Sequence, residues 1–315
     1  MKLRIGSRGS QLALWQANHI AGLLRTQGHE VEIEIIKTTG DRLQEVTFAQ
    51  VGSKGMFTKE IEEALAEGRV DLAVHSLKDL PTELPEPFAL AATPPRVDPR
   101  DALVSVNYMS LAELPVGARV GTSSQRRRAQ LKALRPDIEA QEFRGNVDTR
   151  LRKLVEGQVD AILLAAAGLE RLGKTDLVRE RMSLKDFCPA AGQGALGIET
   201  RKGDDGTITA VAFLDHADTR FAVTAERAAL AALGGGCQVP IGFHCRAISD
   251  LELVGGEPAD EIFGVVADPM TGAAVRIYHR ETRGNFPPAA LGRLAAKMLI
   301  DAGAGPLLQT NGAPH

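Results

Sequence analysis

The chain of 315 residues is poor in cysteine and in aromatic residues, and it has no long apolar run. Its three cysteines, Cys188, Cys237 and Cys245, show no paired spacing and no CxxC motif, so we expect free thiols in a reducing compartment rather than a disulfide framework. No stretch approaches the ~20 apolar residues needed to span a bilayer. The start, Met1–Gly6, alternates like a strand and lacks the apolar run of a signal peptide. We therefore expect a cytoplasmic protein with no membrane segment.

Several functional templates are also missing. Aromatic residues make up 4% of the chain and the net charge is −3, so nucleic-acid binding is not expected. No glycine-rich loop matches a P-loop or a dinucleotide-binding fingerprint. The seven histidines lack metal-ligand spacing. His244 stands beside Cys245 in a predicted strand, where neighbours point to opposite faces. We therefore expect no metal site.

Arginine, by contrast, is abundant. Of the 37 basic residues, 11 are lysines, which leaves 26 arginines. The planar guanidinium suits bidentate binding of carboxylate or phosphate better than the point charge of lysine. The densest basic segment, 119–152, holds nine basic and four acidic residues, and 9 − 4 gives +5. Arg126 and Arg127 fall in the first turn of a predicted helix, where the macrodipole disfavours cations. A bound anion would neutralise both, and the alternative is a solvated basic face.

Other arginines occupy similar junctions between a strand and a helix. Arg8 stands between Ser7 and Ser10, and Arg144 precedes Gly145 with Arg150 following. Ligands of α/β folds bind at the carboxyl ends of strands, where these junctions lie. The arrangement predicts a ligand that carries several carboxylates or phosphates.

Hydrophobic periodicity predicts strands that alternate with helices. We expect a strand at 3–7, a helix that begins after Ser10 and ends at Gly28, and a strand at 31–35. A long mobile loop at 38–55, a helix at 56–67, a strand at 71–75 and a loop at 76–86 should follow. The proline-rich segment 93–100 is interpreted as a connector between domains.

Two echoes of the first part then follow in the same order. Residues 119–125 repeat the strand, glycine and hydroxyl pattern of residues 4–11, and 156–162 repeat 67–73. They predict two domains of similar α/β design that enclose a cleft, although short common signals can also coincide. A strand at 195–200, a helix at 219–233, a meander of strands over 241–281 and a helix from Pro287 stopped by Gly303 indicate a third, smaller α+β domain. Disorder is expected after Gly305.

Two short motifs could carry chemistry. Cys237 lies between three glycines and Pro240, which favours an exposed turn, although a lone cysteine is often a core residue. His75-Ser76-Leu77-Lys78-Asp79 leads from a strand into a loop. Lys78 could hold an anion and Asp79 could stabilise a developing cation, or both could be ordinary exposed charges. If this segment is extended, the two side chains point to different sides.

Together these motifs resemble the porphobilinogen deaminase (hydroxymethylbilane synthase) family over roughly Leu3–Ala302. Each motif alone is weak, but six in family order are specific. The matching segments are Arg4–Ser10 with Leu12–Gln16, Val74–Pro81, Gly121–Arg127, Arg144–Arg150, Ala190–Glu199 and Gly235–Gly242. The resemblance implies an α/β fold of two lobes like those of periplasmic binding proteins, plus a smaller α+β C-terminal domain. It places residues 1–96 and about 195–214 in the first lobe, 97–194 in the second, 216–305 in the C-terminal domain and 306–315 in a tail.

The resemblance also implies a reaction. The family joins four porphobilinogen molecules head to tail, releases ammonia at each step and finally releases linear hydroxymethylbilane by hydrolysis. Its cofactor is a dipyrromethane attached through a thioether to a cysteine that matches Cys237, which would make this thiol an anchor. Each ring carries an acetate and a propionate, which would supply the anion that the arginines require. The resemblance implies a monomer whose partner is the small-molecule substrate porphobilinogen.

Site residues are carried over motif by motif. Asp79 matches the catalytic aspartate, whose carboxylate would stabilise the cationic azafulvenium and the attacking pyrrole in a site that excludes water. Binding of the cofactor is implied for Ser76, Lys78, Thr122, Ser123, Ser124, Arg126, Arg127 and Gly145. Binding of the substrate and the growing chain is implied for Arg8, Ser10, Gln16, Arg144, Arg150, Arg171 and Gln193.

Two departures and one alternative accompany this hypothesis. Gly234 stands where the family more often has an acidic residue, and Ser53 interrupts a usually glycine-paired loop. The alternative is a bilobal binding protein that closes on a polyanionic small ligand without catalysis. It explains the lobes and the arginines but not Cys237, and such proteins usually carry the export signal that we do not expect here.

Overall fold

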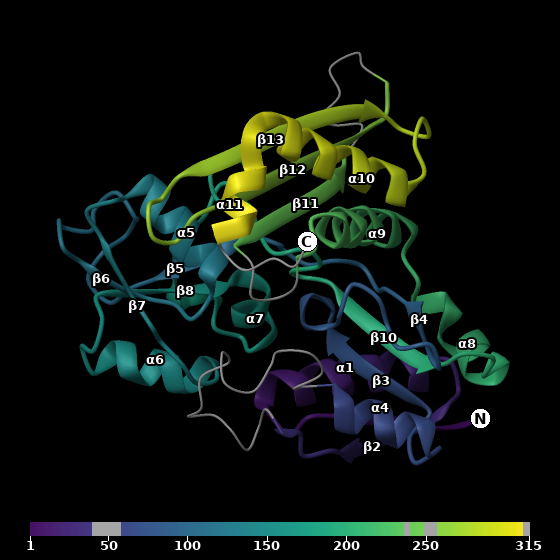
Figure 1. Ribbon diagram of the computed structural model, residues 1–315. Helices are drawn as coiled ribbons and strands as arrows, with labels where there is room; N and C mark the ends of the chain where they lie inside the picture. Colours follow the sequence, from purple (N-terminus) through teal and green to yellow (C-terminus); the bar gives the residue numbers. More distant parts are fainter. Residues whose placement is uncertain (40–57, 236–239, 249–256, 311–315) are drawn as a thin grey trace.

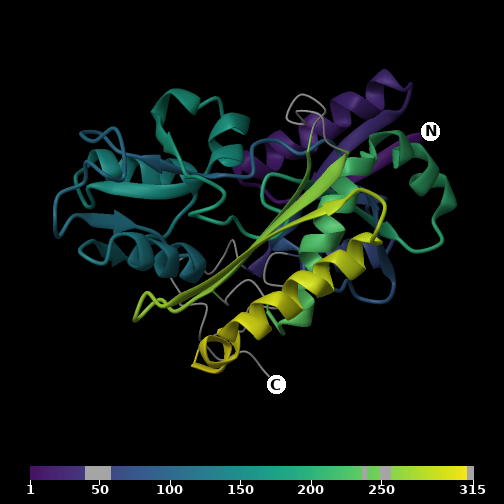
Figure 2. The ribbon, with the colours of Figure 1, turned by 90° about the horizontal axis from the view of Figure 1, so that it is seen from above.

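The computed structural model describes residues 1–39, 58–235, 240–248 and 257–310. Figure 1 shows two lobes side by side, with a third body above them that contains the last three strands. Viewed from above in Figure 2, the strands of this third body run across both lobes. Each body has its own sheet. The predicted class, two α/β lobes plus a smaller α+β domain, is confirmed.

The first lobe has a five-stranded sheet with helices on both faces. Ala17, Ile20 and Leu24, spaced as on one helix face, bury α1 against one side of this sheet, and α8 covers the same side. Ile61 and Leu65 bury α4 against the other side. The sheet order is β2-β1-β3-β10-β4, and the elements are β1 (Lys2–Ser7), α1 (Gln11–Thr26), β2 (Glu30–Ile35), α4 (Lys59–Ala66), β3 (Leu72–Ser76), the 3-10 turn η1 (Leu77–Asp79), β4 (Phe88–Ala92), β10 (Leu196–Arg201), α8 (Asp205–Val211) and η3 (Ala212–Leu214).

The second lobe repeats this plan. Its sheet has the order β7-β6-β8-β5-β9, and its core lies on both faces of the sheet. The elements are β5 (Asp101–Val104), β6 (Arg119–Gly121), α5 (Gln125–Leu134), β7 (Glu139–Gln141), α6 (Val147–Val155), β8 (Ala161–Ala165), α7 (Ala166–Arg171), η2 (Thr175–Leu177) and β9 (Val178–Arg181).

The two sheets share their strand directions as well as their order. In each, three neighbouring strands are parallel, and the fourth, β10 or β5, is antiparallel to both of its neighbours. An arginine–aspartate pair occurs at the same place in both lobes. The main-chain N–H of Arg4 donates to Asp71 at 2.8 Å, and that of Arg119 donates to Asp160 at 2.7 Å. All four residues lie in the repeated segments of the sequence. The predicted similarity of the two lobes is therefore confirmed.

The chain crosses between the lobes twice, along residues 93–100 and again along 189–195. The crossing segments touch at Gly194, whose carbonyl accepts a hydrogen bond from the N–H of Val97 at 3.4 Å. Gly194 has φ +87°, and a Cβ at this position would lie 2.6 Å from the Val97 carbonyl oxygen. Only a glycine allows so close an approach in this conformation. Because of the second crossing, β10 lies in the sheet of the first lobe.

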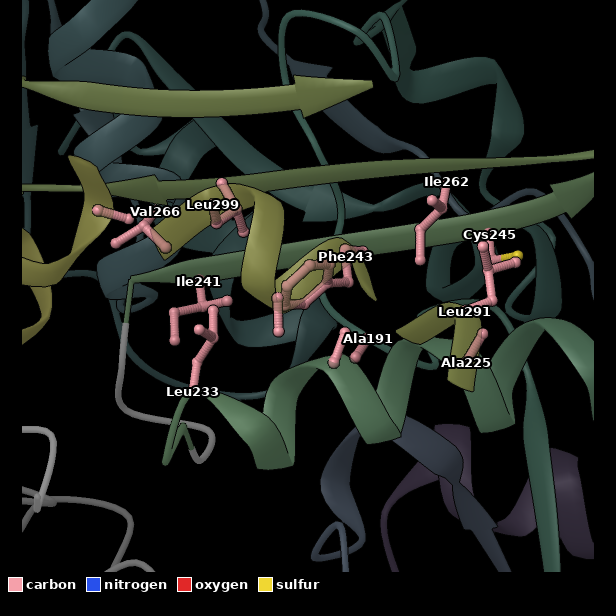
Figure 3. Close-up of a cluster of buried hydrophobic side chains, with 14 of the residues drawn as sticks. Ala191, Ala225, Leu233, Ile241, Phe243, Cys245, Ile262, Val266, Leu291 and Leu299 are labelled. Carbon is pink, nitrogen blue, oxygen red and sulfur yellow. The ribbon is translucent and has the colours of Figure 1, made fainter. Parts of the chain in front are cut away.

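The C-terminal domain packs an antiparallel meander against two helices. Phe243, Ile262 and Leu291 are almost fully buried between them (Figure 3). At the far end of the meander, a Cβ on Gly272 would lie 3.0 Å from the carbonyl oxygen of Lys132 in the second lobe. The elements are α9 (Ala217–Ala232), β11 (Ile241–Ala247), β12 (Ala259–Ala267), β13 (Ala274–Thr282), α10 (Pro288–Leu299), the π-helical turn η5 (Ile300–Ala304) and α11 (Gly305–Thr310).

The expected disorder after Gly305 is wrong as far as Thr310. Gly303, at φ +94°, interrupts the helical backbone as predicted, but the chain then forms α11. Leu308 is 8% exposed because it packs into the core of the C-terminal domain. Apolar packing therefore holds the helix beyond the glycine. Residues 311–315 lie outside the described residues, as does the predicted 38–55 loop from residue 40 onward.

Candidate active site

A polar pocket opens at the carboxyl ends of β1 and β3, between the first turns of α1 and α4. Asp79 lies in it together with side chains from the first two junctions of the chain. This is the edge of an α/β sheet at which ligands bind. The described lining residues are Arg8, Ser10, Leu12, Ala13, Gln16, Thr58, Ile61, Val74, His75, Ser76 and Asp79.

Asp79 is presented by the short turn η1. Leu77 and Leu80, three residues apart, are both buried, and the N–H of Leu80 donates to the Leu77 carbonyl at 3.1 Å. This apolar anchoring leaves Lys78 and Asp79 on the side of the ligand site. The segment is therefore helical rather than extended. The expectation that Lys78 and Asp79 point to different sides required an extended segment, so it does not apply. Asp79 is exposed to solvent, so the expected exclusion of water does not come from the described residues alone.

Hydroxyl groups around the pocket are positioned by their neighbours. The Gln16 amide donates to Ser76 Oγ at 2.8 Å, which ties α1 to the end of β3. Ser10 is the N-cap of α1, and its hydroxyl accepts from the N–H of Ala13 at 3.3 Å. Arg8, on the same turn, lines the pocket. The structure thus brings together four predicted binding residues and Asp79.

Two buried residues behind the pocket were not predicted. His75 Nε2 lies 2.9 Å from Glu199 Oε2, and the two residues are 7% and 0% exposed. His75 also lines the pocket. Glu199 comes from β10, more than a hundred residues further along the chain. The sequence places His75 beside Ser76 but contains no local signal for this partner.

In the second lobe the predicted hydroxyl residues form the turn between β6 and α5. Ser124 is the N-cap of α5, and Thr122 Oγ1 accepts from the N–H of Ser124 at 3.2 Å. Ser123 Oγ accepts from Arg150 at 3.1 Å. Arg150 also donates to the Gly145 carbonyl at 2.8 Å, and Gly145 adopts φ +119°. The predicted residues of two successive junctions are therefore in direct contact.

The anion expected beside Arg126 and Arg127 is supplied by the protein itself. The Asp101 carboxylate is 0% exposed, and it accepts from Arg126 at 2.7 Å and from Arg127 Nε at 2.9 Å. Burial alone would raise the pKa of Asp101, but the two guanidinium groups hold that pKa well below its usual value. The sequence reasoning missed Asp101. Its one local signal is a charged residue at the start of an otherwise apolar strand, Asp101–Val104.

Gln193 and Arg171 join this cluster to the second crossing segment. The Gln193 amide donates to Asp101 Oδ1 at 2.9 Å and to the Pro99 carbonyl at 2.7 Å. Arg171 donates to the Gly194 carbonyl at 2.8 Å. Arg144, by contrast, lies nearer the surface, with its Nε 2.8 Å from Glu142. The structure therefore places Gln193 beside Arg127, and it places Arg144 beside Glu142 and near enough to Arg150 to affect its pKa.

Cations from both lobes meet at this site. Burial lowers the pKa of Lys78 to about 8, with Arg127 and Arg126 acting in the same direction against Asp79 and Asp101. Burial also lowers the pKa of Arg150 to about 10, and Arg127 contributes. Lys78, Arg126, Arg127 and Arg150 thus outnumber Asp79 and Asp101, and Arg144 and Glu142 add one charge of each sign beside Arg150. This excess of positive charge fits a ligand with several carboxylates, which a dipyrromethane bearing acetate and propionate groups would be.

Cys237, the predicted attachment residue, lies outside the described residues, but both flanks are described. Leu233 and Ile241 are 6% and 4% exposed and belong to the core of the C-terminal domain (Figure 3). Gly234 adopts φ +64°, a conformation that suits glycine better than the acidic residue frequent in the family. A Cβ at Gly235 would lie 2.6 Å from Leu230. Backbone conformation at Gly234 and packing at Gly235 therefore account for two of the glycines. Ser53 also lies outside the described residues.

The part of the chain that the structure describes lacks two features, a cluster of metal-ligating side chains and a helix that could span a membrane. It contains no group of three or more His, Cys, Asp or Glu side chains that could hold a metal ion. Its helices include none with the length and apolar character of a membrane span.

The fold and the site define a bilobal α/β protein with a polar pocket and a cluster of cations, and comparison with known proteins defines its family. The profile "Porphobilinogen deaminase, dipyromethane cofactor binding domain" matches residues 3–209, and "Porphobilinogen deaminase, C-terminal domain" matches residues 220–300. The porphobilinogen deaminase of Trichlorobacter lovleyi is 56% identical over 257 residues, which cover 81% of this chain and 82% of that protein. That of Nitratidesulfovibrio vulgaris is 50% identical over 305 residues, which cover 96% and 94%. The chain belongs to the porphobilinogen deaminase family.

Solved structures of other proteins resemble the chain more weakly. A periplasmic substrate-binding protein of an ABC transporter from Coxiella burnetii is 15% identical, with a TM-score of 0.42, over 71% of this chain and 96% of that one.

Proposed function

We propose that this chain is a hydroxymethylbilane synthase, a transferase of tetrapyrrole and haem biosynthesis. It joins four porphobilinogen molecules head to tail on a covalently attached dipyrromethane, releases one ammonia per addition, and releases the linear tetrapyrrole by hydrolysis. The observation that carries the proposal is the meeting of Asp79 with cations of both lobes in a chain of this family. A bilobal binding protein without catalysis is disfavoured, because the family profile describes a cofactor-binding deaminase.

The cations hold the acidic side chains of the pyrroles. The cofactor, when bound, supplies the first nucleophilic pyrrole carbon. The residues that would hold its carboxylates are the cations Lys78, Arg126 and Arg127, the hydroxyl residues Ser76, Thr122, Ser123 and Ser124, and Gly145. The incoming substrate and the growing chain contact a second set of residues. This set consists of Arg8, Ser10, Gln16, Arg144, Arg150, Arg171 and Gln193. The contact between Gln16 and Ser76 supports the grouping, because it joins the two sets at one pocket.

Asp79 stabilises the positive charge that develops when ammonia departs from the substrate. Its carboxylate is oriented by the buried residues Leu77 and Leu80, so little reorganisation is needed as the charge appears. Since Asp79 is exposed in the described structure, the bound pyrroles themselves would displace water from the carboxylate. This displacement would strengthen the electrostatic interaction.

We further propose the predicted domain boundaries, with residues 1–96 and about 195–214 in the first lobe, 97–194 in the second and 216–305 in the C-terminal domain. The enzyme acts as a monomer in the cytoplasm without nucleic acid. The free thiols of Cys188 and Cys245 support a reducing compartment. Size-exclusion chromatography with light scattering tests the monomer. A stable dimer at micromolar concentration would contradict it.

Intact mass spectrometry tests the function at its most specific point. After co-expression with a porphobilinogen supply, the protein should carry the mass of two pyrrole units, and Cys237→Ser should lack it. Cys188→Ala is the matched control, because burial raises the pKa of the Cys188 thiol to about 12 and makes it a poor nucleophile. An unmodified wild-type mass, or an adduct that survives in Cys237→Ser, would contradict the proposal.

A further inference from the structure

Asp101 occupies the centre of the cationic cluster although no part of the proposed reaction needs it. Its two oxygens accept hydrogen bonds from Arg126 and from Arg127, at 2.7 Å and 2.9 Å, and Oδ1 accepts a third from Gln193 at 2.9 Å. With 0% exposure it cannot reach solvent. A buried carboxylate with three side-chain donors in good geometry is fully engaged within the protein.

The backbone holds this carboxylate in a fixed place. Asp101 is the first residue of β5 and pairs with Ala165 of β8, and its carbonyl accepts from the N–H of Met182 at 2.8 Å. Gln193, which bonds its side chain, is itself 1% exposed. The orientation of the carboxylate is therefore set by the sheet and by the crossing segment rather than by a ligand.

The charge balance around it explains why such a group is needed. Arg126 and Arg127 are 4% and 6% exposed. Lys78 and Arg150 lie close enough to Arg127 for its charge to lower their pKa values. Two buried guanidinium groups without an anion would be strongly disfavoured, because each would have lost its hydration without compensation. Before any cofactor is present, Asp101 is the carboxylate among the described residues that accepts hydrogen bonds from both.

We propose that Asp101 is the resident counter-ion of the cofactor site, a positioning residue that holds Arg126 and Arg127 in place before dipyrromethane is attached. This inference rests on the proposed function. When the cofactor is bound, its carboxylates add negative charge to the same cluster. The apo protein therefore depends on Asp101 more strongly than the loaded protein does.

The test compares thermal unfolding of apo and loaded protein. Apo protein is produced without porphobilinogen, then loaded by incubation with porphobilinogen, and loading is verified by intact mass. Asp101→Asn keeps the shape of the side chain but removes its charge. We expect the unfolding midpoint of the apo form to fall by about 10 °C, and that of the loaded form by less than half as much. An equal fall in both forms would show a merely structural role and overturn the proposal.

Asp160→Asn is the matched control, because Asp160 pairs with Arg119 in the same lobe away from the cofactor site. It should lower both midpoints equally.

If Asp101→Asn folds in neither form, the double variant Asp101→Asn/Arg126→Gln removes one cation together with the anion, and its unfolding is measured in the same way. Recovery of folded apo protein supports the proposal, and failure of the double variant to fold overturns it. A wild-type protein that gains no pyrrole mass would instead contradict the proposed function.

Discussion

The Glu226 carboxylate holds the Arg96 guanidinium through two hydrogen bonds, from Nη1 at 2.5 Å and from Nη2 at 3.1 Å. Glu226 belongs to α9, and Arg96 belongs to the first crossing segment. The same carboxylate accepts from the N–H of Gly192 on the second crossing segment at 2.6 Å and from that of Cys245 on β11 at 2.7 Å. One fully buried side chain thus joins both crossing segments to the C-terminal domain.

Acid should destabilise the protein through this group. Burial alone would raise the pKa of Glu226, but Arg96 above all, with His244, lowers it to about 2. A lowered pKa in the folded state means that the stabilisation is complete above the unfolded pKa near 4.5 and is lost as pH falls towards 2. The contribution is on the order of 3 kcal/mol. Urea unfolding between pH 6 and pH 2.5 should show a loss of stability that is smaller in Glu226→Gln.

The control for this prediction is Glu261→Gln, since Glu261 accepts from Arg246 and Tyr278 on the strands of the C-terminal domain and does not touch the crossing segments. This variant should keep the wild-type dependence on pH. If Glu226→Gln lost stability in acid as steeply as the wild type, other carboxylates would account for the effect.

Removal of the Asp79 charge should stop the reaction without unfolding the protein. Asp79→Ala and the isosteric Asp79→Asn should each lower turnover by about 10²–10³ or more, because the developing positive charge loses its carboxylate. The measurement is the rate of ammonia release per molecule that carries the pyrrole adduct. Near-wild-type turnover in either variant would remove Asp79 from the reaction. Glu83→Gln, an exposed carboxylate on the same segment, should retain the wild-type rate.

The local features of this fold could be predicted from the sequence. Ser10 precedes an apolar stripe at helical period, Ser124 ends a strand-glycine-hydroxyl pattern, and both are N-caps in the structure. The repeats that begin at Arg4 and Arg119 predicted two similar lobes, because a strand, a turn and a helix start are encoded within a few residues. Such signals need no knowledge of the rest of the chain.

Partners that are distant in sequence could not be predicted in this way. Asp101 is 25 residues from Arg126, and Glu226 is 130 residues from Arg96. A single acidic residue in a strand or a helix looks the same whether it will be solvated or buried against an arginine. Only the packing of three bodies brings these charges together. This is also why the sequence indicated an anion beside Arg126 and Arg127 but could not show that the protein supplies one itself.

The rate of cofactor attachment should fall above about pH 8, and this fall should depend on Lys78. Because burial lowers the pKa of Lys78 to about 8, its ammonium loses a proton as pH rises through that value, and with it the attraction for a carboxylate. The rate at which apo protein gains the pyrrole mass should therefore fall between pH 7.5 and 9.5. Lys78→Arg stays charged throughout this range and should lack the decline. The same decline in both proteins would assign it to the substrate.

A side chain at Gly194 should disturb both crossing segments. Gly194→Ala would force a Cβ to within 2.6 Å of the Val97 carbonyl oxygen, in a residue at φ +87°. The strained backbone costs about 1–2 kcal/mol, and the displacement of a packed carbonyl adds about 1–3 kcal/mol. Gly203→Ala is the control, because Gly203 has φ +76° but no atom within 4 Å of the added Cβ. Urea unfolding should show the larger loss for Gly194→Ala. Equal losses in the two variants would mean that the crossing segments yield readily, so that Gly194 is needed for its backbone conformation alone.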